Sequence, residues 1–194
     1  MITSFSYPIE IPTARLILRR PTPEDATGLH EAVKASYPEL SRWMVWARGN
    51  YDIEGAEEAC IRAKEGFDSG VRLPTLLRLP NDGKIIGMAE LESIDPEVPS
   101  FEIGYWIHTA YSGHGYVTEA THALTTFAFR ELDSNRVQIR MDTNNQKSWA
   151  IPERLGYTWE ATLKATSRDN LGELATYRVY AMFKIEQLLP LSDV

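Results

Sequence analysis

The chain has 194 residues, of which 43% are hydrophobic and 24% are charged, and its formal net charge is −7. This length predicts one domain spanning residues 1–194, and this composition argues against disorder or a fibrous repeat. The acidic balance argues against a broad basic surface for nucleic acid, and it is compatible with a cationic amine substrate.

The first third of the chain predicts one strand followed by three helices. Alternating residues in Ala14–Pro21 predict the strand. Thr22 can cap the first helix, and Pro23 suits the first helical position. The tryptophan-bearing segment Tyr37–Asn50 predicts a second, short helix, and an alanine-rich stripe predicts a third over residues 53–70.

After Gly70 the pattern changes to period two, which is typical of strands. Two alternating segments flank Pro80–Gly83, whose Asp-Gly pair indicates a hairpin, and Ser100–His108 predicts the next strand. Further elements are a glycine loop, a helix to about Glu131, a strand over Arg136–Asp142, a short helix after Ser148 and two strands around Arg168–Gly172. This order predicts an α/β fold with a mixed, mostly antiparallel twisted sheet flanked by helices.

The cysteine count, the histidine spacing and the length of the apolar runs indicate whether disulfides, a metal site or a membrane segment are expected. Cys60 is the one cysteine, which excludes an internal disulfide framework and fits a reducing compartment. The four histidines have no metal-site spacing, so no metal is expected. No apolar run approaches about 18 residues and no cation precedes Arg15, so we expect a cytoplasmic protein without a membrane partner.

The loop before the helix at Tyr116 carries two glycines, Gly113 and Gly115. A helix N-terminus exposes unpaired N–H groups, and glycines let successive amides turn toward one anion. The spacing alone fits a plain turn equally well. It is not a Walker loop, because no Gly-Lys-Ser/Thr follows, and Thr118 stands where a dinucleotide fingerprint needs a third glycine.

Three segments together carry a family resemblance: "EIGYWI", "SGHGYVTEA" and "NQKSWAIPERLGY". They resemble the acetyl-CoA-binding elements of the GNAT superfamily of N-acetyltransferases, most of all its RimJ/RimL-like branch, which acetylates N-terminal amines of ribosomal proteins. The resemblance covers nearly the whole chain. It implies the GNAT fold, acetyl-CoA as cosubstrate, and direct acetyl transfer to a primary amine, with homodimerisation as a family expectation.

Branch resemblance alone favours a protein or peptide N-terminal α-amine as the acceptor. A small amine, such as an antibiotic, a polyamine or an amino acid, is the alternative acceptor. A non-catalytic CoA-binding module is the alternative class, because two residues depart from the family's phosphate loop: Ser112 replaces an Arg or Gln, and Val117 replaces a small residue.

The resemblance also implies which residues bind the cofactor. Backbone at the end of the preceding strand would pair with pantetheine, the glycine loop would hold the pyrophosphate, and an Asn-x-x-Ser pattern would hold the arm near the thiol. These residues are Trp106, Ile107, His108, Ser112, Gly113, His114, Gly115, Tyr116, Val117, Thr118, Asn145 and Ser148.

Acetyl transfer to an amine needs a base for the amine proton and an acid for the leaving thiolate. Glu102, on the strand before the loop, matches a position where some GNAT enzymes place a general base, and Glu90 and Glu92 are rivals. Ser148 matches the serine proposed to protonate the thiolate in RimL-like enzymes, although a serine there is also a good helix cap. Tyr157 and Tyr180 are alternative acids.

Overall fold

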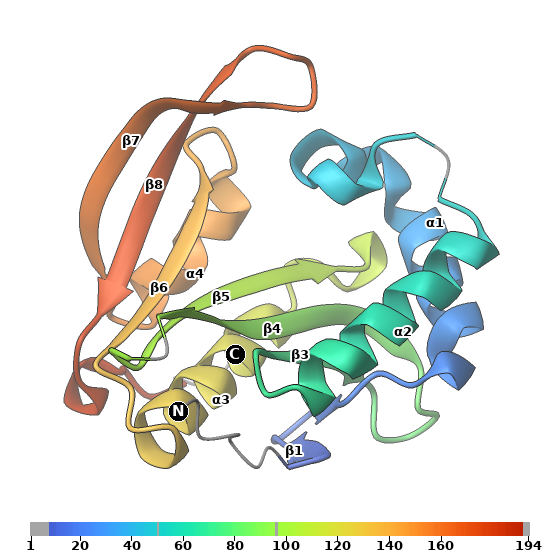
Figure 1. Cartoon of the computed structure of the whole chain (residues 1–194), viewed down its shortest axis with the longest axis horizontal. Helices are drawn as coiled ribbons and strands as arrows, with labels where there is room; N and C mark the ends of the chain where they lie inside the picture. The colour runs from blue at the N-terminus through green and yellow to red at the C-terminus, as the bar shows by residue number, and fades with distance from the viewer. Residues whose placement is uncertain (1–7, 50, 96, 192–194) are drawn as a thin grey trace.

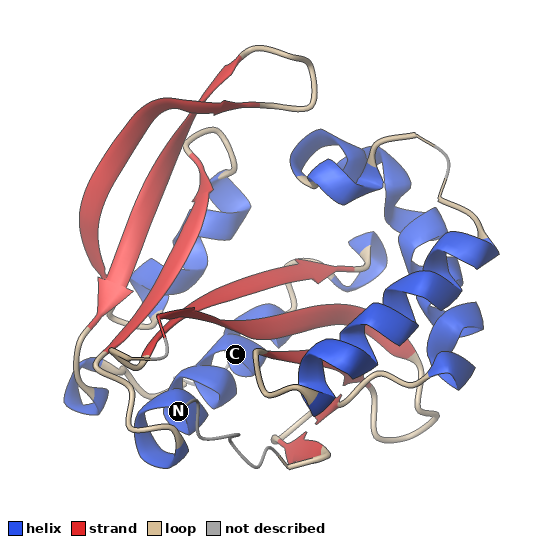
Figure 2. Cartoon of the chain, viewed as in Figure 1, coloured by secondary structure: helices blue, strands red, loops and turns tan. Residues whose placement is uncertain are grey.

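The structure is a computed structural model that describes residues 8–49, 51–95 and 97–191. Its described strands form one sheet in the order β1-β2-β3-β4-β5-β6-β8-β7. The strands are β1 (Glu10–Pro12), β2 (Ile17–Arg19), β3 (Arg72–Arg78), β4 (Ile85–Asp95), β5 (Ser100–Ile107), β6 (Arg136–Asp142), β7 (Thr158–Arg168) and β8 (Leu174–Met182). Among them β5 and β6 run parallel and the other neighbours run antiparallel, so the predicted mixed α/β sheet is confirmed (Figure 2).

Helices cover both faces of this sheet (Figure 1). The helices are α1 (Ala26–Trp43), α2 (Ile53–Asp68), α3 (Tyr116–Glu131) and α4 (Gln146–Arg154). Successive strand residues point to opposite faces, and the two buried clusters follow this alternation. Leu76 and Trp106 pack with α1 and α2, whereas Leu77 and Ile103 pack with α3 and α4.

The strands β5 and β6 diverge early. Their pairing covers three positions, from Ser100 opposite Arg136 to Glu102 opposite Gln138. Beyond Glu102 each strand continues without the other, and Figure 1 shows them spreading apart. The sheet therefore has an internal gap that begins at Glu102.

The second predicted helix is wrong as a separate element. Residues up to Trp43 continue α1 through Pro38, and only a short 3-10 turn, Val45–Ala47, follows. A buried stripe that runs from Leu29 and Val33 to Leu40 keeps this face in the core, so packing overrides the proline's preference to end a helix. Asn50, the predicted end, lies outside the described residues.

One further strand and the start of one helix differ from the prediction. The short strand β1 was not predicted, because three residues carry too little alternation to show a period. Helix α4 begins at Gln146 with Asn145 as its cap, so the cap predicted at Ser148 is wrong. Helix α2 and strand β6 match their predicted positions.

Candidate active site

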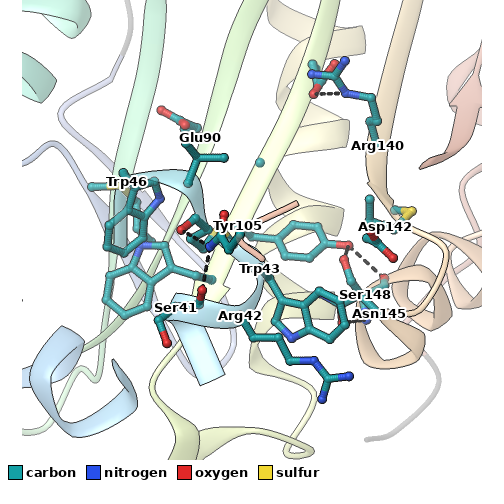
Figure 3. A pocket seen from close by; sticks show the side chains of 18 of the residues that line it. Ser41, Arg42, Trp43, Trp46, Glu90, Tyr105, Arg140, Asp142, Asn145 and Ser148 are labelled. Atoms are coloured by element: carbon teal, nitrogen blue, oxygen red, sulfur yellow. Dashed lines mark hydrogen bonds and ion pairs between the residues drawn. The ribbon is translucent and has the colours of Figure 1, made fainter. Parts of the chain in front are cut away.

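A cavity of about 1410 Å³ lies over the gap between β5 and β6 (Figure 3). Strands β3 to β6 supply its inner surface, the ends of α1 and β7 supply its outer walls, and α4 closes one side. Trp43, Met44 and Trp46, at the end of α1 and in the turn that follows it, are among the residues that line it.

Glu102 lies where the gap opens. Its Oε2 accepts a hydrogen bond of 2.7 Å from Gln138 Nε2, and its Oε1 is 3.6 Å from Arg140 Nε. The side chain is 26% exposed and lines the cavity. Two neighbours from β6 thus orient this carboxylate while an approach from the cavity stays open.

The rival carboxylates stand on the same face of the sheet but on β4, farther from the gap. Glu90 forms an ion pair with Arg72. Glu92 lies opposite Glu102 in the strand pairing and is exposed, with no hydrogen bond or ion pair to the described residues. All three carboxylates line the cavity, but only Glu102 lies on β5, directly beside the gap.

Ser148 lies on the opposite side of the gap and contacts Tyr105. The Tyr105 hydroxyl donates to the Ser148 carbonyl at 2.9 Å, and the Ser148 hydroxyl donates to the Tyr105 hydroxyl oxygen at 3.3 Å. Asn145 Oδ1 accepts from the Ser148 N–H at 3.3 Å, which is the helix cap of α4. Burial raises the pKa of the Tyr105 hydroxyl well above its usual value, so this group stays protonated.

Glu102 and Tyr105 point to opposite faces of β5, because they are three positions apart along the strand and successive side chains alternate between faces. Both nevertheless line the same cavity. The cavity therefore passes through the sheet at the gap, and a carboxylate on one face shares it with a hydroxyl pair on the other.

Tyr157 and Tyr180, the alternative acids, lie away from this cavity. The Tyr157 hydroxyl is 2.5 Å from Thr125 Oγ1 in the core, and the Tyr180 hydroxyl donates to Glu153 at 2.7 Å. Neither tyrosine lines the cavity, which leaves Ser148 as the predicted acid that does.

The glycine loop has the backbone geometry expected of an anion cradle. Gly113 and Gly115 have φ angles of +84° and +78°, in the left-handed region that favours glycine, and α3 begins directly after them. The N–H groups of residues 113–118 have no hydrogen-bond partner among the described residues. A Cβ at Gly113 would meet nothing within 4 Å, so the loop faces open space, and the residues present fit a pyrophosphate group.

The two departures from the family's loop pattern leave this cradle intact. Val117 is buried in the core behind the helix start, so its bulk does not crowd the amides. The Ser112 carbonyl oxygen lies 3.1 Å from His114 Nδ1, and this contact lies within the loop.

A buried carboxylate holds this loop against the N-terminal segment. Glu119 is 3% exposed and accepts hydrogen bonds from Thr13 Oγ1 at 2.6 Å, the Arg15 N–H at 2.7 Å and Arg15 Nε at 2.7 Å. Arg15 also donates to the His114 carbonyl at 3.0 Å. Burial opposes ionisation, but these hydrogen bonds prevail and lower the pKa of Glu119 below its usual value.

The backbone of β5 offers further hydrogen-bonding groups at the gap. The His108 N–H donates to the Ile86 carbonyl, so even-numbered residues of this strand bond to β4 and odd-numbered ones face the gap. Of the three residues predicted to bind pantetheine, Ile107 presents its backbone to the gap, whereas His108 uses its N–H on β4 and Trp106 follows the same register. Tyr105, which was not predicted, presents its backbone there as well.

Comparison with known proteins identifies the family. A model described as "Acetyltransferase (GNAT) domain" matches residues 15–158. The chain belongs to the GNAT family of acetyltransferases. The GNAT fold, the enzyme class of acyltransferase and the resemblance to the RimJ/RimL-like branch, all predicted from the sequence, are confirmed.

Three relatives show how far the similarity extends. The Bacillus subtilis (strain 168) protein named "Putative ribosomal N-acetyltransferase YdaF" is 33% identical over 80% of this chain and 82% of its own length. A solved structure titled "Probable acetyltransferase" is 28% identical, covers 91% of this chain and 98% of its own, and has a TM-score of 0.83. A structure of RimL, titled as a ribosomal L7/L12 α-N-protein acetyltransferase in complex with coenzyme A, shares the fold with a TM-score of 0.84 at 24% identity, over 90% of this chain and 98% of its own.

Two further observations concern the described residues only. They contain no group of three or more His, Cys, Asp or Glu side chains that could hold a metal ion. None of their helices is both long and apolar enough to cross a membrane.

Proposed function

We propose that this GNAT acetyltransferase transfers an acetyl group directly from acetyl-CoA to a primary amine, with a protein or peptide N-terminal α-amine as the acceptor. The observation that carries the proposal is the cavity through the sheet, which joins Glu102 on one face to Ser148 on the other beside the gap. The name of the 33% identical relative, a ribosomal N-acetyltransferase, favours a protein acceptor.

The cofactor would be held by backbone groups. The free amides of residues 113–118 would bind the pyrophosphate at the start of α3, where the helix dipole favours an anion. The unpaired edge of β5 at Tyr105 and Ile107 would bond to the peptide-like pantetheine arm and direct its thiol end toward Ser148.

When bound, acetyl-CoA supplies the acetyl group as an activated thioester and departs as the thiol. Glu102 accepts the proton that the acceptor ammonium must lose before its nitrogen can attack, directly or through one water. The Ser148 hydroxyl, which the Tyr105 hydroxyl orients, would give its proton to the departing sulfur as the C–S bond breaks. The second proton that the attacking nitrogen loses would restore the serine hydroxyl. The N–C bond of the acetylated amine forms as the C–S bond is lost.

Thiol release from acetyl-CoA tests the proposal. The purified chain is incubated with acetyl-CoA and a panel of N-terminal peptides and small amines, and free CoA is measured. We expect release with peptides that carry a free α-amine, and none with the same peptides blocked at the N-terminus. If CoA is released with small amines but with none of the peptides, the proposed acceptor is contradicted. If no amine or peptide in the panel causes CoA release, the enzymatic proposal is contradicted.

A further inference from the structure

The turn between β7 and β8 is hydrogen-bonded across the cavity to the end of α1. Asn170 Nδ2 donates to the carbonyls of Ser41 at 2.6 Å and Met44 at 2.9 Å. Arg48 donates from Nε to Asn170 Oδ1 and from its terminal nitrogen to the Asp169 carbonyl, each at 2.8 Å. Figure 1 shows this hairpin reaching over toward the end of α1, so the two outer walls meet and form a roof.

This roof carries two arginines without a carboxylate partner. Of the five arginines that line the cavity, Arg62, Arg72 and Arg140 form ion pairs with glutamates. Arg42 and Arg168 are exposed and form no ion pair with the described residues.

The other contacts of these two arginines leave their charge available. Arg42 lies over the Trp43 ring at 4.6 Å, and Arg168 uses one nitrogen on the Gly172 carbonyl at 2.5 Å. Asp169, which follows Arg168 in the chain, also lines the cavity; its Oδ1 accepts from the N–H groups of Leu171 and Glu173, and it forms no ion pair with either arginine among the described residues. With two guanidinium groups and one carboxylate, the charged side chains of the roof that line the cavity carry a net positive charge.

The inner surface has the opposite balance. Four carboxylates line it from β4, β5 and β6, namely Glu90, Glu92, Glu102 and Asp142. Two guanidinium groups, Arg72 and Arg140, face them. An excess of negative charge thus lies beside the gap, and an excess of positive charge, from two arginines without an ion pair, lies above it.

We propose that this cavity selects amine acceptors whose reactive end is followed by acidic residues, that is, peptides with an acidic N-terminal segment. The proposal rests on the proposed function and adds the acceptor's chemical class. The terminal ammonium is attracted to the inner carboxylates, and carboxylates farther along the peptide are attracted to Arg42 and Arg168. Complementary charges of this kind steer encounter and reject wrong partners, and their effect falls with ionic strength.

The test compares three hexapeptides that share an N-terminal Ser-Ala and an unblocked α-amine but carry acidic, neutral or basic residues at positions three to six. For the wild type we expect kcat/KM to be on the order of tenfold higher for the acidic than for the basic peptide at low salt. The difference should shrink as salt is added. The double variant R42E/R168E should reverse the order, and K34E, a charge reversal on the exposed part of the same helix α1, should leave it unchanged.

Equal rates for the three peptides, or an acidic preference that survives R42E/R168E, would overturn the inference and leave the proposed function standing. Failure to release CoA with any of the three, while small amines are acetylated, would overturn both the proposed acceptor and this inference. A loss of acetyl-CoA affinity in the double variant would show misfolding, so cofactor binding is titrated alongside. If it is lost, R42A and R168A are measured singly, and each should lower the acidic preference.

Discussion

The hydroxyls of Tyr105, on β5, and Ser148, on α4, are hydrogen-bonded to each other beside the gap. Tyr105 donates to the Ser148 carbonyl at 2.9 Å and receives a hydrogen bond of 3.3 Å from the Ser148 hydroxyl. This pairing fixes the start of α4 relative to the strand that carries Glu102. The proposed acid is therefore positioned by a residue from the same strand as the proposed base.

Replacing Tyr105 by phenylalanine should lower kcat more than it changes the KM for acetyl-CoA. The variant keeps the ring but removes both hydrogen bonds to Ser148, so the serine hydroxyl loses its orientation. We expect a fall in kcat on the order of tenfold, measured by thiol release. The matched control is Y157F, because the Tyr157 hydroxyl bonds to Thr125 outside the cavity. Wild-type kcat in Y105F would show that the contact has no part in catalysis.

Three glutamine substitutions separate the candidate bases. E102Q should lower kcat by about 10²- to 10⁴-fold, because glutamine preserves the shape of the side chain but cannot accept the proton. E90Q and E92Q should change kcat far less, since both residues lie on β4 away from the gap. All three variants are measured at saturating acetyl-CoA. A larger loss of kcat in E92Q or E90Q than in E102Q would reassign the base.

Glu119 should make the protein's stability depend on pH in the acidic range. Because its folded pKa is lowered, its ionised form stabilises the fold at and above its usual unfolded value of 4.5, and this contribution is lost as pH falls through the folded pKa. E119Q should lower the free energy of unfolding by about 1–3 kcal/mol near neutral pH and by less at pH 3. Urea denaturation at both pH values measures this. E57Q, an exposed site on α2, is the control, and equal losses for the two variants would contradict the account.

Gly113 provides a test of the phosphate cradle. Alanine there meets no neighbouring atom, but its φ of +84° is strained for a residue with a side chain. G113A should shift the loop amides and weaken acetyl-CoA binding by about five- to tenfold in isothermal titration. Gly172 has a similar φ of +87° and equal space, so G172A controls for backbone strain alone. Equal acetyl-CoA affinity for wild type and G113A would argue against the cradle.

Local pattern predicted much of the fold. The strand Arg136–Asp142 alternates cleanly, and α2 has a full apolar stripe, so both were placed correctly. The break predicted within α1 failed because the burial of Leu40, a tertiary effect, outweighs the local preference of Pro38. Local signals describe a segment's own preference and do not include the surface against which it packs.

In the candidate site, too, residues within local motifs could be predicted and contacts between distant segments could not. Glu102, Ser148 and the glycine loop carry recognisable motifs and were predicted, and their chemical roles remain predictions. The contact between Tyr105 and Ser148 depends on where β5 and β6 diverge, which no motif encodes. The hydrogen bonds of Asn170 to the end of α1 join positions more than one hundred residues apart, beyond the reach of any periodicity.

Acetylation of a peptide α-amine tests the central claim most directly. An unblocked peptide is incubated with acetyl-CoA and the wild type, E102Q or S148A, and mass spectrometry locates the acetyl group. The account predicts an acetyl group on the α-amine with the wild type and a much lower yield with either variant. An unmodified peptide at millimolar acetyl-CoA, or equal acetylation by all three proteins, would contradict it.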